Sequence, residues 1–393
     1  MKLHTKAIHV GDRKAPRIHI PSTTPIVLSS SFIYPEASTL DKVFGNEIDG
    51  FAYSRYDNPT CSALQELMTE LEGGHNSYVT GSGMAALQLA LMAALVDRRK
   101  HVLAANALYG ATMSLLTKVL APFGVETTFV DICDLAAVEA AIEREKPGAI
   151  LMETISNPIL RVGEMDKIAA LANKCGAALI VDNTFATPLI LRPFELGAHL
   201  VVHSLTKYLA GHGDVLGGVV VTDEAHDGIL QTLYRTTGPN LGPFEAYLAM
   251  RGIKTFPIRM ERHCHNACHV ANFLATHPMV DRVYYAGDPR HPDAATIARL
   301  FPKSLNGAIV SIEIKDKDRA GILEFIDRLK LVVRGTTLGD VHSLILYPAM
   351  ASHRDMSPKQ RERMGIKDNL VRLSIGLEAA EDICADLDQA LNG

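Results

Sequence analysis

Short apolar segments alternate with helical segments from about Asn58 to Met260, and this alternation restricts the possible folds more than any other feature of the chain. The apolar segments lack the alternating polar residues of half-exposed strands, which is typical of strands covered on both faces of a sheet. We therefore predict an α/β domain with a mostly parallel sheet, built from βαβ units. The predicted strands are 77–80, 101–105, 126–130, 149–152, 179–182 and 200–202, and the predicted helices include 64–72, 135–145 and 164–175.

The regions on either side of this alternation have a different character. Residues 1–57 contain turn-forming residues such as Pro21 and Pro35 and few periodic segments, so we predict an extended arm that packs on a neighbouring subunit. Residues 58–258 form the predicted α/β domain, and residues 259–393 a smaller α+β domain whose antiparallel sheet is solvated on one side. The elements predicted in this last part are a helix at 259–277, strands at 309–314 and 371–375, and helices at 318–329 and 379–391.

The composition argues against several classes of partner. The chain has 393 residues, 47% of them hydrophobic, and a net charge of −5 without a long basic run, so neither nucleic acid nor an anionic membrane is expected to bind. The first residues do not lead into the apolar core of a signal peptide, and the apolar run 84–96 is too short to span a bilayer. Six cysteines in a chain of this length indicate reduced thiols. We therefore expect a soluble cytoplasmic protein.

Lys207 and Asp182 lie at the ends of two predicted apolar strands. Open α/β sheets bind ligands at the carboxyl ends of their strands. A lysine and an acid in that place, with the hydroxyls of Ser204 and Thr206 nearby, match the requirements of pyridoxal phosphate (PLP). The amine can form an imine with the aldehyde, the carboxylate can keep the ring nitrogen protonated, and the hydroxyls can bind the phosphate. A strand-end carboxylate can also serve only as a cap, so the combination with Lys207 carries this interpretation.

The glycine-rich segment 81–86 (GSGMAA) follows the strand 77–80 and opens an apolar helix. Free N–H groups and the helix dipole at such a place bind phosphate, with a dipole contribution of about 0.3–1 kcal/mol. The segment also matches the dinucleotide fingerprint of a nicotinamide-dependent oxidoreductase, which requires an acid after the next strand. Asn106 follows the strand 101–105 instead, which argues against this alternative. A glycine turn that only allows close packing is a third interpretation.

Four further residues are candidates by their chemistry. Tyr109 follows a strand end, where its ring could stack on a planar cofactor and its phenol could donate a proton, although a surface turn is equally compatible. Tyr53 and Arg55 in the arm combine a phenol and a guanidinium that suit phosphate, and they could complete the site of a neighbouring subunit. Arg372 could bind a substrate carboxylate through two hydrogen bonds, although by itself it is typical of a surface position.

The segment 263–269 (HCHNACH) has the spacing of metal ligands on a helix. However, the pairs Cys264/Cys268 and His265/His269 fall on different helix faces, and no second group of ligands completes either pair. We therefore predict no metal site, and interpret the segment as a polar helix with two packed thiols.

Together these segments resemble the Cys/Met metabolism PLP-dependent family of trans-sulfuration enzymes, which includes cystathionine gamma-synthase, cystathionine gamma-lyase and methionine gamma-lyase. The resemblance runs over nearly the whole chain. The segments that carry it are 53–60 (YSRYDNPT), 81–85 (GSGMA), 108–110 (LYG), 181–184 (VDNT), 203–212 (HSLTKYLAGH), 251–255 (RGIKT) and 371–376 (VRLSIG).

The resemblance implies a PLP-dependent transferase fold of type I, with Lys207 as the Schiff-base lysine, Asp182 on the pyridine nitrogen and Tyr109 stacked on the ring. It implies that Asn157 lies near the 3-hydroxyl group and that Arg372 binds the substrate carboxylate. It also implies a homotetramer of two catalytic dimers. The residues implied to bind phosphate are Ser82, Gly83, Met84, Ser204 and Thr206, with Tyr53 and Arg55 reaching in from the adjacent subunit.

The positions expected to select the substrate depart from the family pattern. Ala111 stands where methionine gamma-lyases typically have cysteine, and Thr336 where cystathionine gamma-lyases have glutamate. Thr337 replaces the usual serine whose backbone meets the substrate carboxylate, so we expect Thr337 and Tyr53 beside the substrate. The resemblance implies a C–S lyase that acts on a sulfur amino acid by γ-elimination and gives 2-oxobutyrate, ammonia and a thiol. γ-Replacement between an O-acylhomoserine and cysteine, and β-elimination of cystathionine, stay open.

Overall fold

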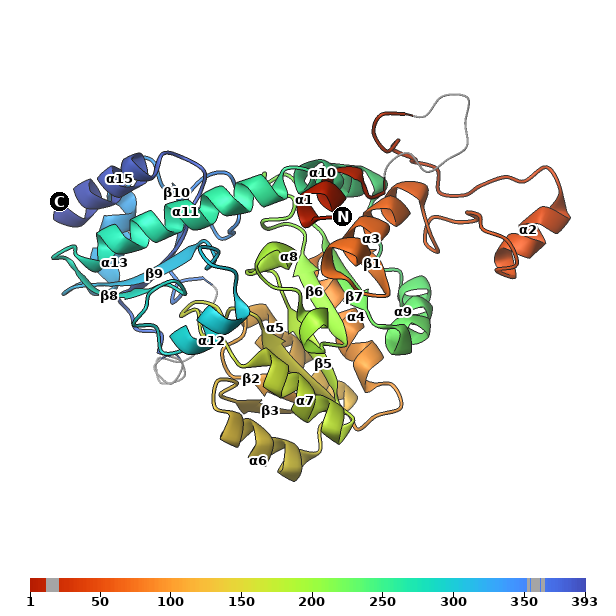
Figure 1. Ribbon diagram of the computed structural model, residues 1–393, viewed down its shortest axis with the longest axis horizontal. Coiled ribbons are helices and arrows are strands. Elements are labelled where there is room, and N and C mark those ends of the chain that lie inside the picture. The colour runs from red at the N-terminus through yellow and green to blue at the C-terminus, as the bar shows by residue number, and fades with distance from the viewer. Residues whose placement is uncertain (12–20, 352–353, 355–360, 362–364) are drawn as a thin grey trace.

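The computed structural model describes residues 1–11, 21–351, 354, 361 and 365–393. Within that part of the chain, the larger of two sheets has the strand order β1-β7-β6-β5-β4-β2-β3 (Figure 1). The strands β2 to β6 run parallel to one another, and β7 lies antiparallel between β1 and β6. The strands of this sheet are β1 (Asn76–Thr80), β2 (His101–Ala105), β3 (Glu126–Val130), β4 (Ala149–Glu153), β5 (Ala178–Asp182), β6 (Leu200–Ser204) and β7 (Gly218–Thr222).

The predicted mostly parallel α/β sheet is confirmed, and the predicted strands lie within one or two residues of the observed ends. All residues of β2 and β4 are buried, so both faces of the sheet are covered, as their uninterrupted apolar sequences predict. The sequence analysis did not predict the strand β7. Its residues (GVVVT) follow the polar segment 211–217 without a crossover helix before them, which explains its antiparallel pairing with β6.

Helices cover this sheet and connect its strands. The long apolar helix α4 packs against β5, β6 and β7, while α6 and α7 pack against β3 and β5. The α-helices of this part are α3 (Pro59–Glu72), α4 (Gly83–Leu95), α5 (Gly110–Ser114), α6 (Leu135–Glu145), α7 (Met165–Cys175), α8 (Thr187–Ile190), α9 (Glu224–Thr237) and α10 (Pro243–Ile253), with the π-helix η1 (Leu115–Leu120) and the 3₁₀-helices η2 (Ala121–Phe123) and η3 (Pro193–Leu196).

A second sheet has the strand order β10-β11-β12-β9-β8 and lies beside α11, α13 and α15 (Figure 1). Its central strands pair antiparallel, as predicted, whereas β10 and β11 pair parallel. The elements of this part are α11 (Phe256–Ala275), β8 (Val280–Tyr284), α12 (Ala294–Leu300), β9 (Ile309–Ile314), α13 (Arg319–Arg328), β10 (Val333–Arg334), β11 (Leu344–Leu346), β12 (Leu370–Ser374) and α15 (Ala380–Asn392).

The prediction that one side of this second sheet is solvated is wrong for its central strands. All residues of β9 and β12 are buried. The polar side chains on the face predicted to meet water instead meet the large domain, since Ser311 Oγ donates to the carbonyl of Pro158 at 2.7 Å and Arg372 reaches Asn157. The long helix α11 also begins at Phe256, three residues before the predicted start.

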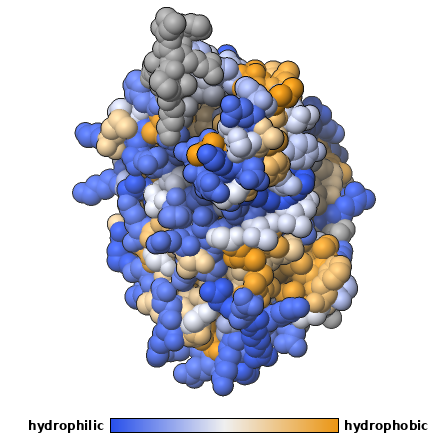
Figure 2. Space-filling view, turned by 90° about the vertical axis from the view of Figure 1, so that its right-hand side faces the viewer, coloured by the Kyte–Doolittle hydropathy of each residue, from blue (hydrophilic) through white to orange (hydrophobic). Residues whose placement is uncertain are grey.

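The N-terminal part contains two short helices, α1 (Leu3–His9) and α2 (Ala37–Phe44). The described residues on either side of α2 extend away from the rest of the molecule (Figure 1). Large hydrophobic side chains are exposed there, among them Leu28, Ile33 and Phe44. Figure 2 shows patches of hydrophobic surface on the side of the molecule that carries α2. In the described part of the chain, no helix combines the length and the hydropathy needed to cross a bilayer.

An ion pair ties the segment after β4 to the segment before α12. Arg161 donates to both oxygens of Asp293, at 2.7 and 3.0 Å, and the backbone N–H of Val162 donates to the same carboxylate at 2.9 Å. Burial raises the pKa of Asp293, but the hydrogen bonds from Arg161 and Val162 outweigh it, and the pKa is lowered overall. The charged form of Asp293 therefore stabilises the contact between the two parts of the chain.

Asp293→Asn should lower the free energy of unfolding by roughly 1.5–3 kcal/mol at neutral pH, because the variant loses charge-assisted hydrogen bonds. The folded pKa of Asp293 is lowered, so its contribution is present above the unfolded pKa and is lost as the pH falls through the folded value. The difference between variant and wild type in urea denaturation should therefore be complete above about pH 4 and shrink as the pH falls below that value. Glu324→Gln, which breaks an exposed pair with Arg328, should cost at most about 0.5 kcal/mol. Equal effects of the two variants would contradict this account.

Candidate active site

Three parallel strands end side by side and bring the predicted residues together. In the register of the sheet, Glu153 of β4 lies beside Asp182 of β5, and Asp182 lies beside Val202 of β6. Lys207 follows the end of β6 within one turn, and its N–H donates to the carbonyl of Ser204 at 3.3 Å. The carboxyl ends of these strands form the place where open α/β sheets bind ligands.

The Lys207 amine is largely buried and donates to the Thr337 hydroxyl at 2.7 Å. Burial, aided by the charge of nearby Arg372, lowers the pKa of this amine from 10.5 to about 8. A lysine in this state has a substantial neutral fraction near physiological pH, and the neutral amine is the nucleophilic form.

Asp182 is held by the turn that follows its own strand. The backbone N–H of Thr184 donates to Asp182 Oδ1 at 3.0 Å. Burial raises the pKa of Asp182, while hydrogen bonds from Thr184 and the nearby ring of His203 act in the opposite direction. That ring contacts Glu72 at 2.5 Å, so a buried carboxylate and histidine lie behind the acid. The arrangement suits a carboxylate whose charge is completed by a cationic partner in the site.

The start of α4 forms a close-packed cradle at the strand ends. Ser82 caps the helix through a hydrogen bond from the N–H of Ala85 to its hydroxyl, at 3.1 Å. A Cβ added to Gly83 would lie 2.9 Å from the Cβ of Ser204, and one added to Gly218 would lie 2.2 Å from the carbonyl oxygen of Ser82. Only glycine permits this approach. The first N–H groups of α4, those of Gly83 and Met84, therefore open beside β6.

The two predicted hydroxyls lie on the same stretch of chain as Lys207. Ser204 ends β6, and its N–H donates to the hydroxyl of Thr184 at 2.9 Å. Thr206 Oγ1 accepts from the N–H of Gly217 at 3.1 Å. The loop that carries the lysine is therefore tied to β5 on one side and to the start of β7 on the other.

Tyr109 stands at the start of α5, and its side chain is 44% exposed. Its backbone N–H donates to Glu153 Oε1 at 2.6 Å, which ties the loop after β2 to the end of β4. The phenol lies close enough to Arg372 to raise the pKa of that guanidinium, against the larger effect of burial. The ring is thus accessible at the mouth of the site and anchored through its main chain.

Arg372 is only 3% exposed, so its interpretation as a surface residue is wrong. Its Nη1 donates to Asn157 Oδ1 at 3.0 Å and its Nη2 to the carbonyl of Thr337 at 3.3 Å, while Nε is buried and has no partner among the residues that the structure describes. Burial lowers the pKa of the guanidinium to about 10. A buried cation with an unused donor is suited to an anion from outside the chain.

Tyr53 and Arg55 lie apart from these groups. Arg55 stacks over Tyr56 at 4.7 Å from the ring centroid and donates to the carbonyl of Arg235. Tyr53 is 42% exposed on the arm. Within the described residues, neither side chain has a hydrogen bond with the residues gathered around Lys207.

The sequence analysis missed Glu153, which lies beside Asp182 and holds Tyr109. The signal was available, because Glu153 is the first polar residue after an uninterrupted apolar strand, as Asp182 is on the neighbouring strand. It also missed the pair Glu72–His203, whose members lie far apart in the sequence and meet only through packing of α3 on the sheet.

The segment 263–269 is helical, as predicted, and lies within α11. His263 Nδ1 contacts the carbonyl of Ile375 at 2.7 Å. Cys264 is buried but Cys268 is exposed, so the prediction of two packed thiols is wrong for Cys268. Among the described residues, no group of three or more histidine, cysteine or acidic side chains could hold a metal ion.

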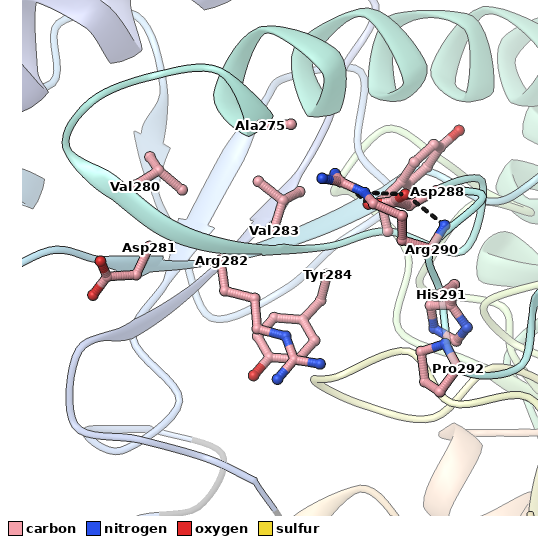
Figure 3. Close-up of a pocket in the computed structure, with 11 residues that line it drawn as sticks. Ala275, Val280, Asp281, Arg282, Val283, Tyr284, Asp288, Arg290, His291 and Pro292 are labelled. Carbon is pink, nitrogen blue, oxygen red and sulfur yellow. Dashed lines mark hydrogen bonds and ion pairs between the residues drawn. The ribbon is translucent and has the colours of Figure 1, made fainter.

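A pocket of about 270 Å³ lies elsewhere, at the edge strand β8 and the turn after it (Figure 3). Its charged groups include Arg282 and the Asp288–Arg290 pair, whose members bond to each other at 2.9 and 3.0 Å. None of the predicted site residues lines this pocket. The chemistry at the strand ends is therefore separate from it.

The residues at the strand ends fit PLP. The buried Lys207 amine, whose pKa is lowered, matches the aldehyde, and the acid at the end of β5 matches the ring nitrogen. The start of α4, which Gly83 allows to approach β6, matches the phosphate. Lys207 would hold the aldehyde carbon, Asp182 the ring nitrogen, and Tyr109 one face of the ring. The residues that would hold the phosphate are Ser82, Gly83, Met84, Ser204 and Thr206.

Comparisons with known proteins agree with this chemistry. L-methionine gamma-lyase of Fusobacterium nucleatum subsp. polymorphum is 42% identical over 99% of this chain and 98% of that protein. Cystathionine gamma-lyase of Bacillus subtilis is 41% identical over 100% of this chain and 99% of that protein. A solved structure from Campylobacter jejuni that contains N'-pyridoxyl-lysine-5'-monophosphate has a TM-score of 0.92, with 30% identity over the full length of both chains.

The family model of the Cys/Met metabolism PLP-dependent enzymes matches residues 4–392, which is nearly the whole chain. This extent, the full-length relatives and the strand-end lysine with its acid all agree. The protein belongs to the Cys/Met metabolism PLP-dependent enzyme family, and acts with PLP as a C–S lyase or synthase of sulfur amino acid metabolism.

Proposed function

We propose that this protein cleaves the C–S bond of a cystathionine- or methionine-type amino acid by γ-elimination, and releases 2-oxobutyrate, ammonia and a thiol. The observation that carries the proposal is the buried Lys207 amine, 2.7 Å from Thr337 and beside the buried cation Arg372. The similarity to gamma-lyases over the full chain supports it. Bound PLP supplies the electron sink that makes the Cα proton of an amino acid acidic.

Arg372 binds the substrate carboxylate in this proposal. Asn157 and the carbonyl of Thr337 hold its two terminal nitrogens, so the guanidinium plane is fixed before substrate arrives. The unused Nε donor and the loss of water around the buried cation favour a carboxylate over a neutral group. Tyr53 would contact the same substrate from the arm of a neighbouring subunit.

Lys207 and Tyr109 handle protons in this proposal. The Lys207 amine, once free, accepts the proton from Cα, and the Thr337 hydroxyl keeps the amine in place for that transfer. The same amine exchanges a proton at Cβ, and the Tyr109 phenol donates one to the leaving sulfur. Burial favours the neutral amine that can accept a proton near neutral pH.

The active form in this proposal is a cytoplasmic homotetramer of two catalytic dimers. Residues 1–57 act as an arm, except that α1 packs on α3 and α11 of its own chain and not on a neighbour. Residues 58–258 bind the cofactor, and residues 259–393 close the site with Arg372. Exposed apolar side chains such as Ile33, which is 95% exposed, support burial of the arm on a second copy. Arg55 and Tyr53 then complete the phosphate site of that copy.

Removal of the Lys207 amine should lower turnover by about 10²–10⁴-fold or more, because the variant loses the group that moves the proton. In the wild type, apoprotein should take up PLP faster as the pH rises, with a midpoint near 8, because only the neutral amine attacks the aldehyde. The visible absorbance of the cofactor measures PLP uptake, and release of keto acid measures turnover. Lys174→Ala, on the exposed side of α7, serves as the control. A Lys207→Ala protein that keeps the wild-type absorbance, or a midpoint near 10.5, would contradict the assignment.

Product analysis separates the reactions open to this family. L-Methionine, L-cystathionine, L-cysteine, and an O-acylhomoserine with cysteine are each incubated with the holoenzyme, and keto acids and thioethers are measured separately. We expect 2-oxobutyrate from methionine or cystathionine. Pyruvate from cystathionine would instead identify β-elimination, and formation of cystathionine from the acylated substrate would identify γ-replacement. Lack of turnover of all four would refute an enzymatic role in sulfur amino acid metabolism.

Mixed oligomers test whether Arg55 serves a neighbouring site. Lys207→Ala and Arg55→Ala chains are each expected to be inactive, but a mixed dimer contains one site with both wild-type residues if the arm crosses over. Random mixing should then restore roughly a quarter of wild-type activity, since half of the dimers are mixed and each has one intact site of two. No recovery above the two parent proteins would place Arg55 in the site of its own chain.

A further inference from the structure

Glu153 is the buried acid next to Asp182 that no step above uses. It ends β4 in direct register with Asp182 of β5, and only 8% of it is exposed. Its Oε1 accepts the backbone N–H of Tyr109 at 2.6 Å. Its Oε2 is buried and has no hydrogen-bond partner among the described residues. A charged carboxylate with an unpaired buried oxygen is costly, whereas a protonated carboxyl carries no charge that burial would strip of water.

A negative charge on both Glu153 and Asp182 would be destabilising, because the two buried carboxylates would repel each other. Burial first, and the charge of Asp182 second, raise the pKa of Glu153 to about 8. The hydrogen bond from the Tyr109 N–H, the nearby backbone of Asn157 and the charge of Arg372 act in the opposite direction but do not cancel this effect. Asp182 has the hydrogen bonds of Thr184 and can meet a cationic ring nitrogen. The proton at neutral pH therefore belongs on Glu153.

Glu153 also connects a buried strand to an exposed side chain of the site. Its strand is in the centre of the sheet, with every residue buried, while the Tyr109 ring it anchors is 44% exposed at the mouth. The helix α5 that follows Tyr109 continues directly into η1 and η2, and Tyr109 makes no side-chain cap to it. The N–H of Asn106 donates to the carbonyl of Val130 at 2.8 Å, and the bond from the Tyr109 N–H to Glu153 connects the same loop to the sheet at the tyrosine itself.

We propose that Glu153 is a positioning residue that, as an uncharged carboxyl, anchors the Tyr109 main chain and so sets the tyrosine ring over the cofactor, while Asp182 alone carries the negative charge. Glu153 itself touches no reacting atom in this role. The charged and titratable groups that face it are Asp182 from β5, Arg372 from β12 and Tyr109 from the loop after β2.

The test compares Glu153→Ala with Glu153→Gln. Glutamine is isosteric with the uncharged acid and can still accept the Tyr109 N–H, so it should restore activity to within about threefold of wild type. Alanine removes the anchor, and misplacement of a positioned group should lower kcat by about 10–100-fold with a smaller change in KM. Circular dichroism of the visible cofactor band, measured on holoenzyme without substrate, should change in Glu153→Ala and recover in Glu153→Gln.

A double-mutant cycle connects the effect to the tyrosine. If Glu153 acts through Tyr109, Glu153→Ala should cost far less in a Tyr109→Phe background than in the wild type. Glu313→Gln is the matched control, since Glu313 is also a buried carboxyl, on β9, but contacts Tyr284 and Lys367 far from Lys207. It should leave the cofactor band unchanged, and thermal unfolding checks that all variants are folded.

Two results would overturn the inference. Glu153→Gln that is as impaired as Glu153→Ala would show that the charge of Glu153 is needed, and additive effects of the Glu153 and Tyr109 changes would show that it does not act through the tyrosine. Only the predicted changes in kcat and KM of the Glu153 variants rest on the proposed function. The dichroism of the bound cofactor requires no turnover, so a wrong substrate assignment and a wrong role for Glu153 give different outcomes.

Discussion

The parallel pairing of β4, β5 and β6 is the constraint on which the candidate site depends, because it determines which side chains share the edge of the sheet. Glu153 and Asp182 are in register, and a slip of one residue would turn either acid to the opposite face. The helix α4 can bring its N–H groups to the same edge only because Gly83 allows contact with Ser204. Close backbone approach and strand register thus assemble the site before any ligand binds.

Burial acts on the ionisable groups of this site in one common sense, toward the neutral form. It lowers the pKa of Lys207 and Arg372 and raises that of Glu153. The guanidinium keeps its charge because its ordinary pKa is so high, whereas near pH 7 the lysine becomes partly neutral and the glutamate largely neutral. The second sheet contributes to this by covering the strand ends with Arg372 of β12. If the strand ends were open to water, the same residues would be hydrated and would keep pKa values close to their ordinary ones.

Much of the large domain could be predicted, since its buried strands are continuous apolar segments without alternating polar residues, which is typical of a sheet covered on both faces. Lys207, Asp182 and the segment 81–86 were found by the same logic, as polar residues at strand ends. Glu153 met the same criterion and was overlooked. The solvated face predicted for the second sheet was wrong, because the alternating polar residues of β12 contact the large domain rather than water. Alternating polar residues in a strand indicate that one face meets polar groups, but not whether these groups belong to water or to another part of the protein.

The sequence by itself determined the α/β sheet, the family and the residues suited to PLP, because each depends on local periodicity or on residue types at strand ends. Only the tertiary structure decided which of these residues meet. It buried Arg372 against Asn157, placed the Thr337 hydroxyl on the Lys207 amine, and paired Glu153 with Asp182. Such contacts join segments far apart in the chain, and their energies depend on burial, which local sequence does not encode.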